Sequence, residues 1–291
     1  NTLLSEGWKV IGLDCMNNYY DVSLKERRES ILLENASYRS LHEKVETPNV
    51  LMELFEEERP NVVIHLAAQA GVRYSIENPR AYLESNICGT FELLEAARAF
   101  PPEHILIAST SSVYGSNEDM PYTETVKADH QMSFYAATKK STENMAHSYA
   151  HLYHLPITMF RFFTVYGPWG RPDMALFKFT KAILNGDTID VYNNGDLRRD
   201  FTYIDDLIQA MLLLVDTIPG VSLSPKDDIR LFDGKSNVAP FRVVNIGNSR
   251  PTQLLDFITA IEKSLGTKAK KNFMPMQAGD VPATWANTSL L

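Results

Sequence analysis

The chain has 291 residues, the size of one large domain or of two modest ones. It carries 28 Lys and Arg against 36 Asp and Glu, which gives a formal net charge of -8. An acidic chain without a clustered basic excess is not expected to bind nucleic acid. The composition, 44% hydrophobic and 22% charged, is that of a globular protein. No apolar run approaches the ~20 residues that cross a bilayer, so we expect no membrane insertion.

The two cysteines, Cys15 and Cys88, are too few to staple a chain of this size. We expect reduced, buried thiols in a cytoplasmic protein. No grouping of Cys, His and acidic residues has the spacing of a metal site, so we predict no bound metal.

The first part of the chain alternates short apolar runs with amphipathic segments. The apolar runs predict buried strands over 10–13, 62–66, 105–108 and 157–162, and the segments 86–100 and 141–154 predict helices. On the first helix we expect Ile87, Phe91, Leu94 and Ala97 to form the buried stripe. Strands of continuous apolar character separated by helices indicate an α/β fold, with a doubly wound parallel (Rossmann) sheet.

The pattern changes after residue 166, where a loop rich in glycine and proline begins at Gly167. Helices are predicted over 175–184, 205–216 and 253–265, and the polar stretch 219–240 between the last two predicts an exposed, mobile insertion. We therefore expect a first domain over 1–166 and a smaller C-terminal α/β substrate-binding domain over 167–291, with strand exchange between them.

Asp14 closes the first predicted strand, where an acid accepts hydrogen bonds from the ribose hydroxyls of an adenine dinucleotide. An acid at this position repels a 2′-phosphate and so favours NAD over NADP. Asn17 and Asn18, in the turn that follows, are assigned to the same site, although Asp14 may instead only cap this turn. The glycine-rich turn that normally precedes such an acid is not in the sequence. We expect a further strand–turn–helix of roughly twenty residues before Asn1 and further helices after Leu291.

Tyr135 and Lys139 are four residues apart, which on a helix places both side chains on one face. A free tyrosine titrates near 10, and a neighbouring ammonium is expected to lower that pKa toward the working range of a general base. The hydroxyl run 109–112 follows a predicted strand, so it faces the crevice in which such sheets bind ligands.

These motifs resemble the extended short-chain dehydrogenase/reductase enzymes that act on nucleotide sugars. The resemblance rests on five segments in the family's order: His65–Ala68, Asn86–Thr90, Ser111–Gly115, Tyr135 with Lys139, and Arg199–Phe201. It covers almost the whole chain and implies Tyr135 as the base, Lys139 as its partner and Thr110 as the hydroxyl beside it. It also implies bound NAD, contacted by Leu66, Ala67, Ala68, Asn86 and Phe162, and a homodimer.

The positions after Thr110 distinguish reactions within this family. Dehydratases that resemble this chain have an Asp-Glu pair there, and decarboxylases have a glutamate at the second position, whereas this chain has Ser111 and Ser112. The resemblance therefore implies 4-epimerisation through a transient 4-keto sugar. The segments 70–75, 162–175 and 279–284 closely resemble UDP-glucuronate 4-epimerases, which implies a UDP-hexuronate substrate and polysaccharide precursor supply.

The same resemblance assigns the substrate contacts. Neutral hydroxyls bind a carboxylate without promoting loss of CO2, and guanidinium groups grip a diphosphate; the assigned residues are Ser111, Ser112, Thr164, Arg171, Arg199 and Asp280. Arg73 is either a further substrate contact or a solvated loop cation. UDP-galactose epimerisation, decarboxylation, NAD-dependent dehydrogenation and non-catalytic dinucleotide sensing stay open as alternative functions.

Overall fold

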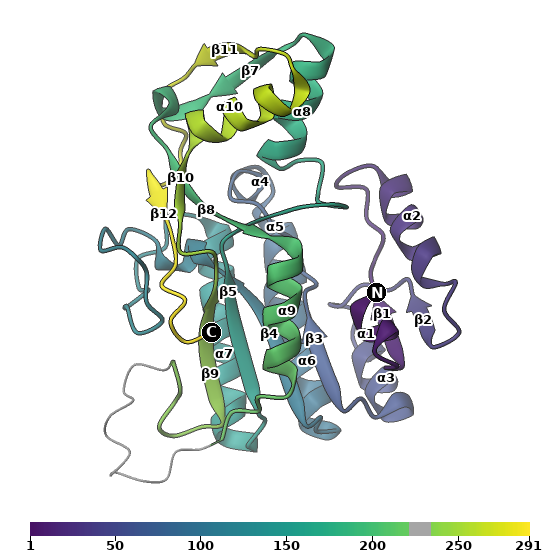
Figure 1. Cartoon of the computed structure of the whole chain (residues 1–291). Coiled ribbons are helices and arrows are strands. Elements are labelled where there is room, and N and C mark those ends of the chain that lie inside the picture. The colour runs from purple at the N-terminus through teal and green to yellow at the C-terminus, as the bar shows by residue number, and fades with distance from the viewer. Residues whose placement is uncertain (221–233) are drawn as a thin grey trace.

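The computed structural model describes residues 1–220 and 234–291. Most of the insertion expected over 219–240 falls in 221–233 and so lies outside the described residues. A lower α/β body carries a smaller upper lobe built from the later part of the chain (Figure 1).

The lower body is built on parallel strands. β3 (Val62–His65), β4 (His104–Thr110), β5 (Ile157–Phe162) and β9 (Phe241–Ile246) form one parallel sheet in that order. β1 (Val10–Leu13) and β2 (Tyr38–Leu41) form a second parallel pair, and no pairing among the described residues joins it to β3. All seven residues of β4 are buried, as expected for a central strand covered on both faces.

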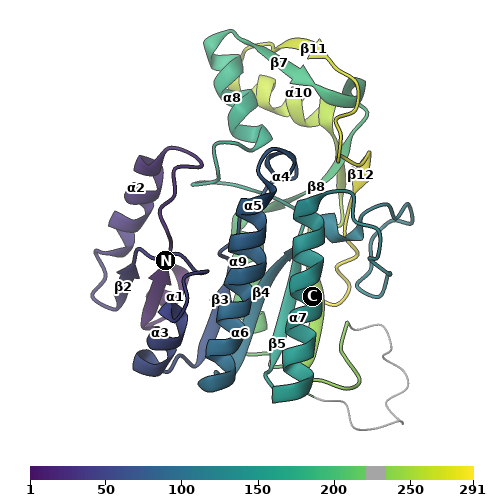
Figure 2. The same cartoon turned by 180° about the vertical axis from the view of Figure 1, so that it is seen from behind.

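Helices cover both faces of the four-stranded sheet, which confirms the α/β class (Figures 1 and 2). One face packs against α6 (Gly89–Ala99) and α7 (Phe134–Tyr153), and the other packs against α9 (Ile204–Val215). The core is therefore divided by the sheet, with Leu94 and Ala146 on one side and Met211 and Leu214 on the other. β9 comes from the later part of the chain and completes this sheet beside β5.

The remaining helices of the lower body flank its strands. They are α1 (Thr2–Ser5), α2 (Val22–Leu32), α3 (Val50–Glu58), α4 (Tyr74–Glu77) and α5 (Pro79–Tyr82), followed by a π-helical turn, Leu83–Cys88, and a 3-10 turn, Ser111–Tyr114. The predicted helix over 86–100 therefore begins in the π-helical turn. Phe91 is 44% exposed, so its place on the buried stripe was wrong; Leu93 takes the position beside Leu94.

The upper lobe consists of two helices packed on short strands. α8 (Ala175–Asn185) and α10 (Leu254–Leu265) bury Ile183 and Ile258 against β7 (Thr188–Val191), which pairs in parallel with β11 (Lys270–Phe273). A mixed sheet joins the lobe to the body: β8 (Arg198–Tyr203) pairs with β6 (Thr164–Tyr166), β10 (Pro251–Gln253) and β12 (Ala283–Thr284).

Both cysteines are free and exposed, so the expectation that they are buried was wrong. Cys15 lies in the loop after β1, and Cys88 ends the π-helical turn. Among the described residues, no helix is both long and apolar enough to cross a membrane, and no group of Cys, His, Asp and Glu residues there has the geometry of a metal site.

Candidate active site

Helix α7 presents Tyr135 and Lys139 because its start is fixed by a cap. The Ser133 side chain accepts a hydrogen bond from the Ala136 N–H at 3.1 Å, so the helix begins at Phe134 and Tyr135 lies in its first turn. Lys139 follows one turn later on the same face and is 3% exposed. The two residues therefore lie on one helix at the spacing that places both side chains on the same face.

The hydroxyl run lies at the carboxyl end of β4, as predicted. Thr110 ends the strand, and its Oγ1 accepts a hydrogen bond from the Ser112 N–H at 3.2 Å, which starts the 3-10 turn. Thr110 also donates to the Ser112 hydroxyl at 3.3 Å and shares a side-chain hydrogen bond with Tyr135. Ser111 is the first residue of the same turn and is half-buried.

The sequence analysis predicts a lowered pKa for the Tyr135 phenol, and this prediction was wrong because the pKa is raised. Burial raises the pKa of Tyr135, and the hydrogen bond with Thr110 and the charge of Arg171 only partly offset that rise. Burial also lowers the pKa of Lys139 to about 8, against the raising effect of Glu143. Desolvation is the largest effect on the pKa of both groups.

The residues assigned to the cofactor follow the carboxyl ends of β1, β3 and β5. The Asp14 carboxylate is 62% exposed, 3.7 Å from the Lys25 ammonium, and it accepts the Met16 N–H at 2.7 Å. Asn17 accepts a hydrogen bond from Lys25 at 3.1 Å, and Asn18 is exposed. Asp14, Asn17 and Asn18 thus lie in the loop after β1, where Lys25 contacts the first two.

Beyond β3, Leu66 is 53% exposed and is followed by the half-buried Ala67 and Ala68. Asn86 is 1% exposed; its Oδ1 accepts the Gln69 N–H at 2.8 Å, and its Nδ2 donates to the Gln69 carbonyl and to Thr138. The Asn86 amide therefore fixes the loop that carries Leu66. Phe162 is half-buried and its ring contacts Phe160.

Three of the assigned substrate residues meet between the body and the lobe. Asp280 lies between two guanidinium groups, 3.6 Å from Arg73 and 3.9 Å from Arg199. Arg199 also donates to the carbonyls of Arg198 and Pro282, and Arg73 lies over the ring of Tyr192. The structure therefore places Arg73 in the same charge cluster as the other two, rather than alone in solvent.

Arg171 pairs with a residue that the sequence analysis did not assign. It forms a bidentate ion pair with Asp173, with Nε to Oδ1 at 3.1 Å and Nη2 to Oδ2 at 2.9 Å. Asp173 also accepts a hydrogen bond from the Tyr19 hydroxyl at 3.4 Å. Thr164 begins β6 nearby along the chain and is half-buried.

A row of tyrosine rings connects the loop after β1 with the catalytic helix. Tyr19 contacts Tyr74, Tyr74 contacts Tyr82, and the Tyr82 ring packs edge-on against Tyr135 with centroids 5.8 Å apart. Besides Tyr135, only Tyr74 belongs to a segment singled out in the sequence. No periodic signal marks the others, because they come from separate loops and helices.

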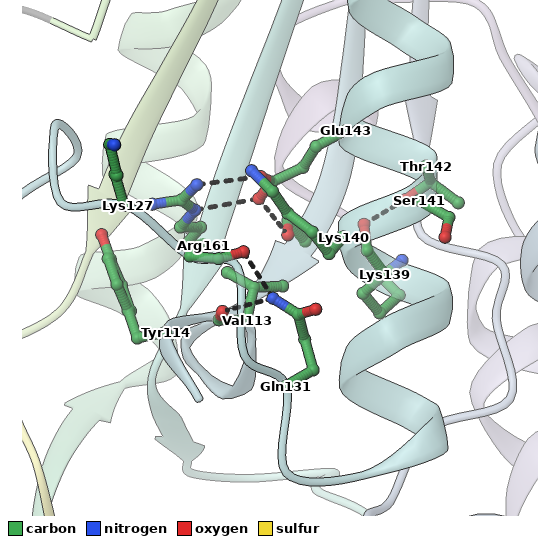
Figure 3. A network of polar contacts seen from close by, with 12 residues as sticks. Val113, Tyr114, Lys127, Gln131, Lys139, Lys140, Ser141, Thr142, Glu143 and Arg161 are labelled. Carbon is green, nitrogen blue, oxygen red and sulfur yellow. Dashed lines mark hydrogen bonds and ion pairs between the residues drawn. The ribbon is translucent and has the colours of Figure 1, made fainter. Parts of the chain in front are cut away.

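A buried ion pair lies behind the catalytic helix (Figure 3). Glu143 accepts two hydrogen bonds from Arg161 of β5, at 2.9 and 2.8 Å, and both side chains are 3% exposed. The sequence offered one signal for it: Arg161 is a cation within an otherwise apolar predicted strand.

Comparisons with known proteins agree with this geometry. The chain is 52% identical over 291 residues to a "Probable UDP-glucuronate 4-epimerase" of Rhizobium meliloti, covering 99% of this chain and 84% of that protein. It is 53% identical over 288 residues to "Protein CapI" of Staphylococcus aureus, covering 98% and 84%. The crystal structure of a UDP-glucuronic acid 4-epimerase from Bacillus cereus, in complex with UDP-glucuronic acid and NAD, matches with a TM-score of 0.85 at 32% identity, covering 99% and 85%.

The family model described as the NAD dependent epimerase/dehydratase family matches residues 1–222. That match covers more than half of the chain, and the two sequence relatives are similar over nearly all of it. The chain belongs to the NAD dependent epimerase/dehydratase family.

Proposed function

We propose that this protein catalyses NAD-dependent 4-epimerisation of a UDP-hexuronate, interconverting UDP-glucuronate and UDP-galacturonate through a transient 4-keto sugar. One observation carries the proposal: Tyr135 shares a hydrogen bond with Thr110, and the next two residues are serines. Dehydration and decarboxylation in the enzymes that this chain resembles use an acid at one or both of these positions, which Ser111 and Ser112 do not supply. A ketone formed beside this phenol therefore lacks the acid that would promote dehydration or loss of CO2 from these two positions.

The residues of the cofactor region fit an adenine dinucleotide. An exposed carboxylate at the end of β1, Asp14, offers acceptors for ribose hydroxyls, and the small side chains of Ala67 and Ala68 leave room beside β3. We assign NAD binding to these residues with Asn17, Asn18, Leu66, Tyr135, Lys139 and Phe162, and a supporting role to Asn86. NAD, when bound, supplies the acceptor for a hydride from C4 of the sugar and the donor for its return.

The chain's own groups move one proton and hold the substrate. Tyr135 takes the proton of the C4 hydroxyl and later gives it back, with Thr110 as its hydrogen-bonding partner and the Lys139 ammonium one turn away. Arg171, Arg199 and Arg73 bind the diphosphate, because guanidinium groups match its oxygens. We assign Asp280 to a hydroxyl of the uridine ribose, and Ser111, Ser112 and Thr164 to the hexuronate carboxylate.

We assign NAD binding mainly to residues 1–166 and nucleotide-sugar binding mainly to 167–291. We also propose that the protein acts as a homodimer. Leu83, Phe91 and Leu152 are exposed apolar side chains on the π-helical turn, α6 and α7. Helices α6 and α7 lie side by side (Figure 2), which supports a helical interface. Two free, exposed thiols suit a reducing compartment, so we place the activity in the cytoplasm. Sedimentation of the purified protein at twice the chain mass is the expected result for the dimer.

Parallel incubation with UDP-galacturonate and UDP-galactose, followed by separation of the products, tests the proposed function. We expect conversion of UDP-galacturonate to UDP-glucuronate, with no net formation of NADH and no pentose product. Faster conversion of UDP-galactose would contradict the hexuronate assignment. A UDP-pentose would indicate decarboxylation, and steady accumulation of absorbance at 340 nm would indicate a simple dehydrogenase.

A further inference from the structure

The buried carboxylate of Glu143 lies on the same helix as Tyr135 and Lys139 and contacts the strand that ends at Thr110. It lies one turn beyond Lys139 and two turns beyond Tyr135 on α7, so the three side chains lie along one face of the helix. It also accepts a hydrogen bond from the Ser109 hydroxyl at 2.6 Å, and Ser109 directly precedes Thr110 on β4. A single carboxylate thus touches the strand that carries one catalytic residue and the helix that carries the others.

The charge on Glu143 is well compensated. Arg161 binds it in bidentate fashion, and Lys140 contributes a third cationic contact at 3.0 Å. The Arg161 guanidinium is itself held over the ring of Tyr114, 4.6 Å from the centroid. These contacts lower the pKa of Glu143 to about 2, against the raising effect of burial, so the carboxylate is ionised at neutral pH. A fully paired buried charge of this kind fixes the geometry of its neighbours.

The charged and titratable groups around Lys139 come from three elements. Tyr135, Lys140 and Glu143 lie on α7, His65 lies on β3, and Arg161 lies on β5 behind Glu143. His65 is buried and its pKa is lowered to about 3, so it is neutral. Burial lowers the pKa of Lys139, and the negative charge of Glu143, one helical turn away, raises it and so stabilises the ammonium form.

We propose that Glu143 is a positioning residue of the active centre, which holds the end of β4 through Ser109 and keeps Lys139 charged beside Tyr135. This proposal deepens the proposed function and rests on it for the roles of Tyr135, Lys139 and Thr110. A purely structural ion pair would stabilise the fold without changing the protonation of Lys139. The two possibilities therefore predict different values for the pKa of Lys139 when Glu143 is replaced.

The test compares Glu143→Gln, the double variant Glu143→Gln/Arg161→Met and the control Glu262→Gln. Breaking a buried pair by removing one partner is strongly destabilising, whereas replacing both partners is much less so, so the double variant keeps the test possible if the single variant does not fold. Glu262 is an equally buried carboxylate, paired with Lys268 and Lys271 on the upper lobe. Glu262→Gln therefore removes a buried negative charge, as Glu143→Gln does, but at a site far from Lys139.

The first measurement is an NMR titration of the lysine ammonium groups in isotope-labelled protein, with Lys139 assigned from Lys139→Arg. We expect the pKa of Lys139 to fall by about 1–2 units in Glu143→Gln, to fall less in the double variant, because that variant also removes the Arg161 cation, and to stay unchanged in Glu262→Gln. The alkaline limb of the kcat profile moves to lower pH by the same amount in each Glu143 variant, and kcat falls more than KM changes. The parent pKa for Lys139 and the parent pH profile in Glu143→Gln, or in the folded double variant if the single variant does not fold, would overturn the proposal.

The titration needs no turnover, so it reports on Glu143 even if the substrate is another nucleotide sugar. A protein that does not epimerise UDP-hexuronates but shows the Lys139 shift would refute the proposed function alone. The opposite result, an active epimerase without the shift, would refute the role of Glu143 alone.

Discussion

The Tyr135 phenol lies in surroundings that oppose its ionisation. Burial raises its pKa, and the hydrogen bond with Thr110 and the charge of Arg171 are the two described effects that lower it. Both belong to residues assigned to catalysis or to substrate binding. The groups that lower the pKa of the proposed base are therefore groups that we also assign to the site.

Tyr135→Phe removes the proton-transferring hydroxyl and leaves the ring contact with Tyr82 in place. We expect kcat to fall by about 10²–10⁴-fold, while the Kd for UDP stays within a few-fold of the parent value. Tyr153→Phe, at the half-exposed end of the same helix, is the matched control and should be fully active. Undiminished turnover by Tyr135→Phe would remove the phenol from the mechanism.

His65 is a packed core residue, as its apolar strand predicts. Burial and then the charge of Lys139 lower its pKa to about 3, from 6.5. The folded state therefore binds fewer protons than the unfolded state between pH 6.5 and 3, so the free energy of unfolding falls as the pH drops through that window. We expect His65→Gln to flatten this part of the Tm-against-pH curve and the exposed His130→Gln not to; equal slopes in both variants would contradict the account.

At the scale of elements, the turn after β4 depends on one glycine. Gly115 ends the 3-10 turn that holds Ser111 and Ser112, with a φ of 60° and a ψ of −124°. A Cβ at this position would lie 2.0 Å from the carbonyl oxygen of His130. Backbone, rather than a flexible side chain, blocks the substitution.

Gly115→Ala is expected to cost about 3 kcal/mol of stability, because it adds a steric clash to a strained backbone conformation. Gly186→Ala is the control: its φ is also positive, at 75°, but a Cβ there meets no atom within 4 Å, so we expect a cost of about 1 kcal/mol. Chemical denaturation of both variants measures the difference. Equal losses of stability in the two variants would show that the turn accommodates a Cβ easily. We expect turnover to fall only in Gly115→Ala.

The loop after β6 holds Arg171 in an ion pair with Asp173. The pair occupies the Nε and Nη2 edge of the guanidinium, so Asp173 competes with a diphosphate for that edge. Asp173→Asn weakens the competing pair, so we expect the Kd for UDP, measured by calorimetry, to decrease several-fold. We also expect this Kd to depend less on salt concentration than the Kd of the parent protein. Weaker binding by Asp173→Asn would show that Asp173 instead orients Arg171 for the ligand.

The long elements were predictable because their patterns are strong. The strand over 157–162 matches β5, and helices α8, α9 and α10 begin and end within one residue of prediction. β2 was missed because Tyr38–Leu41 has polar residues at two of its four positions and pairs only with β1. Phe91 was misplaced because spacing alone does not show where the edge of the buried face lies: Leu93, Leu94 and Ala97 of α6 are buried, whereas Phe91 is exposed.

At the scale of the whole molecule, long-range contacts assemble the site. Asp200 of β8 is fully buried and accepts backbone N–H groups from Asn248, Ser249 and Ala286, so one carboxylate connects the upper sheet to the segments after β9 and near Leu291. Family motifs in the sequence indicate Tyr135, Lys139 and Arg199 as candidate site residues. The pairing of Glu143 with Arg161 and of Asp173 with Arg171 depends on tertiary contacts that spacing alone does not encode.

The central claim is that one phenol removes and returns a proton while the hydrogen at C4 leaves the sugar and comes back to the same carbon. UDP-glucuronate carrying deuterium at C4, followed by proton NMR of the purified products, tests it most directly. We predict UDP-galacturonate that retains the label at C4, with the carboxylate intact. Washout of the label into water, or a product that has lost its carboxylate, would contradict the claim.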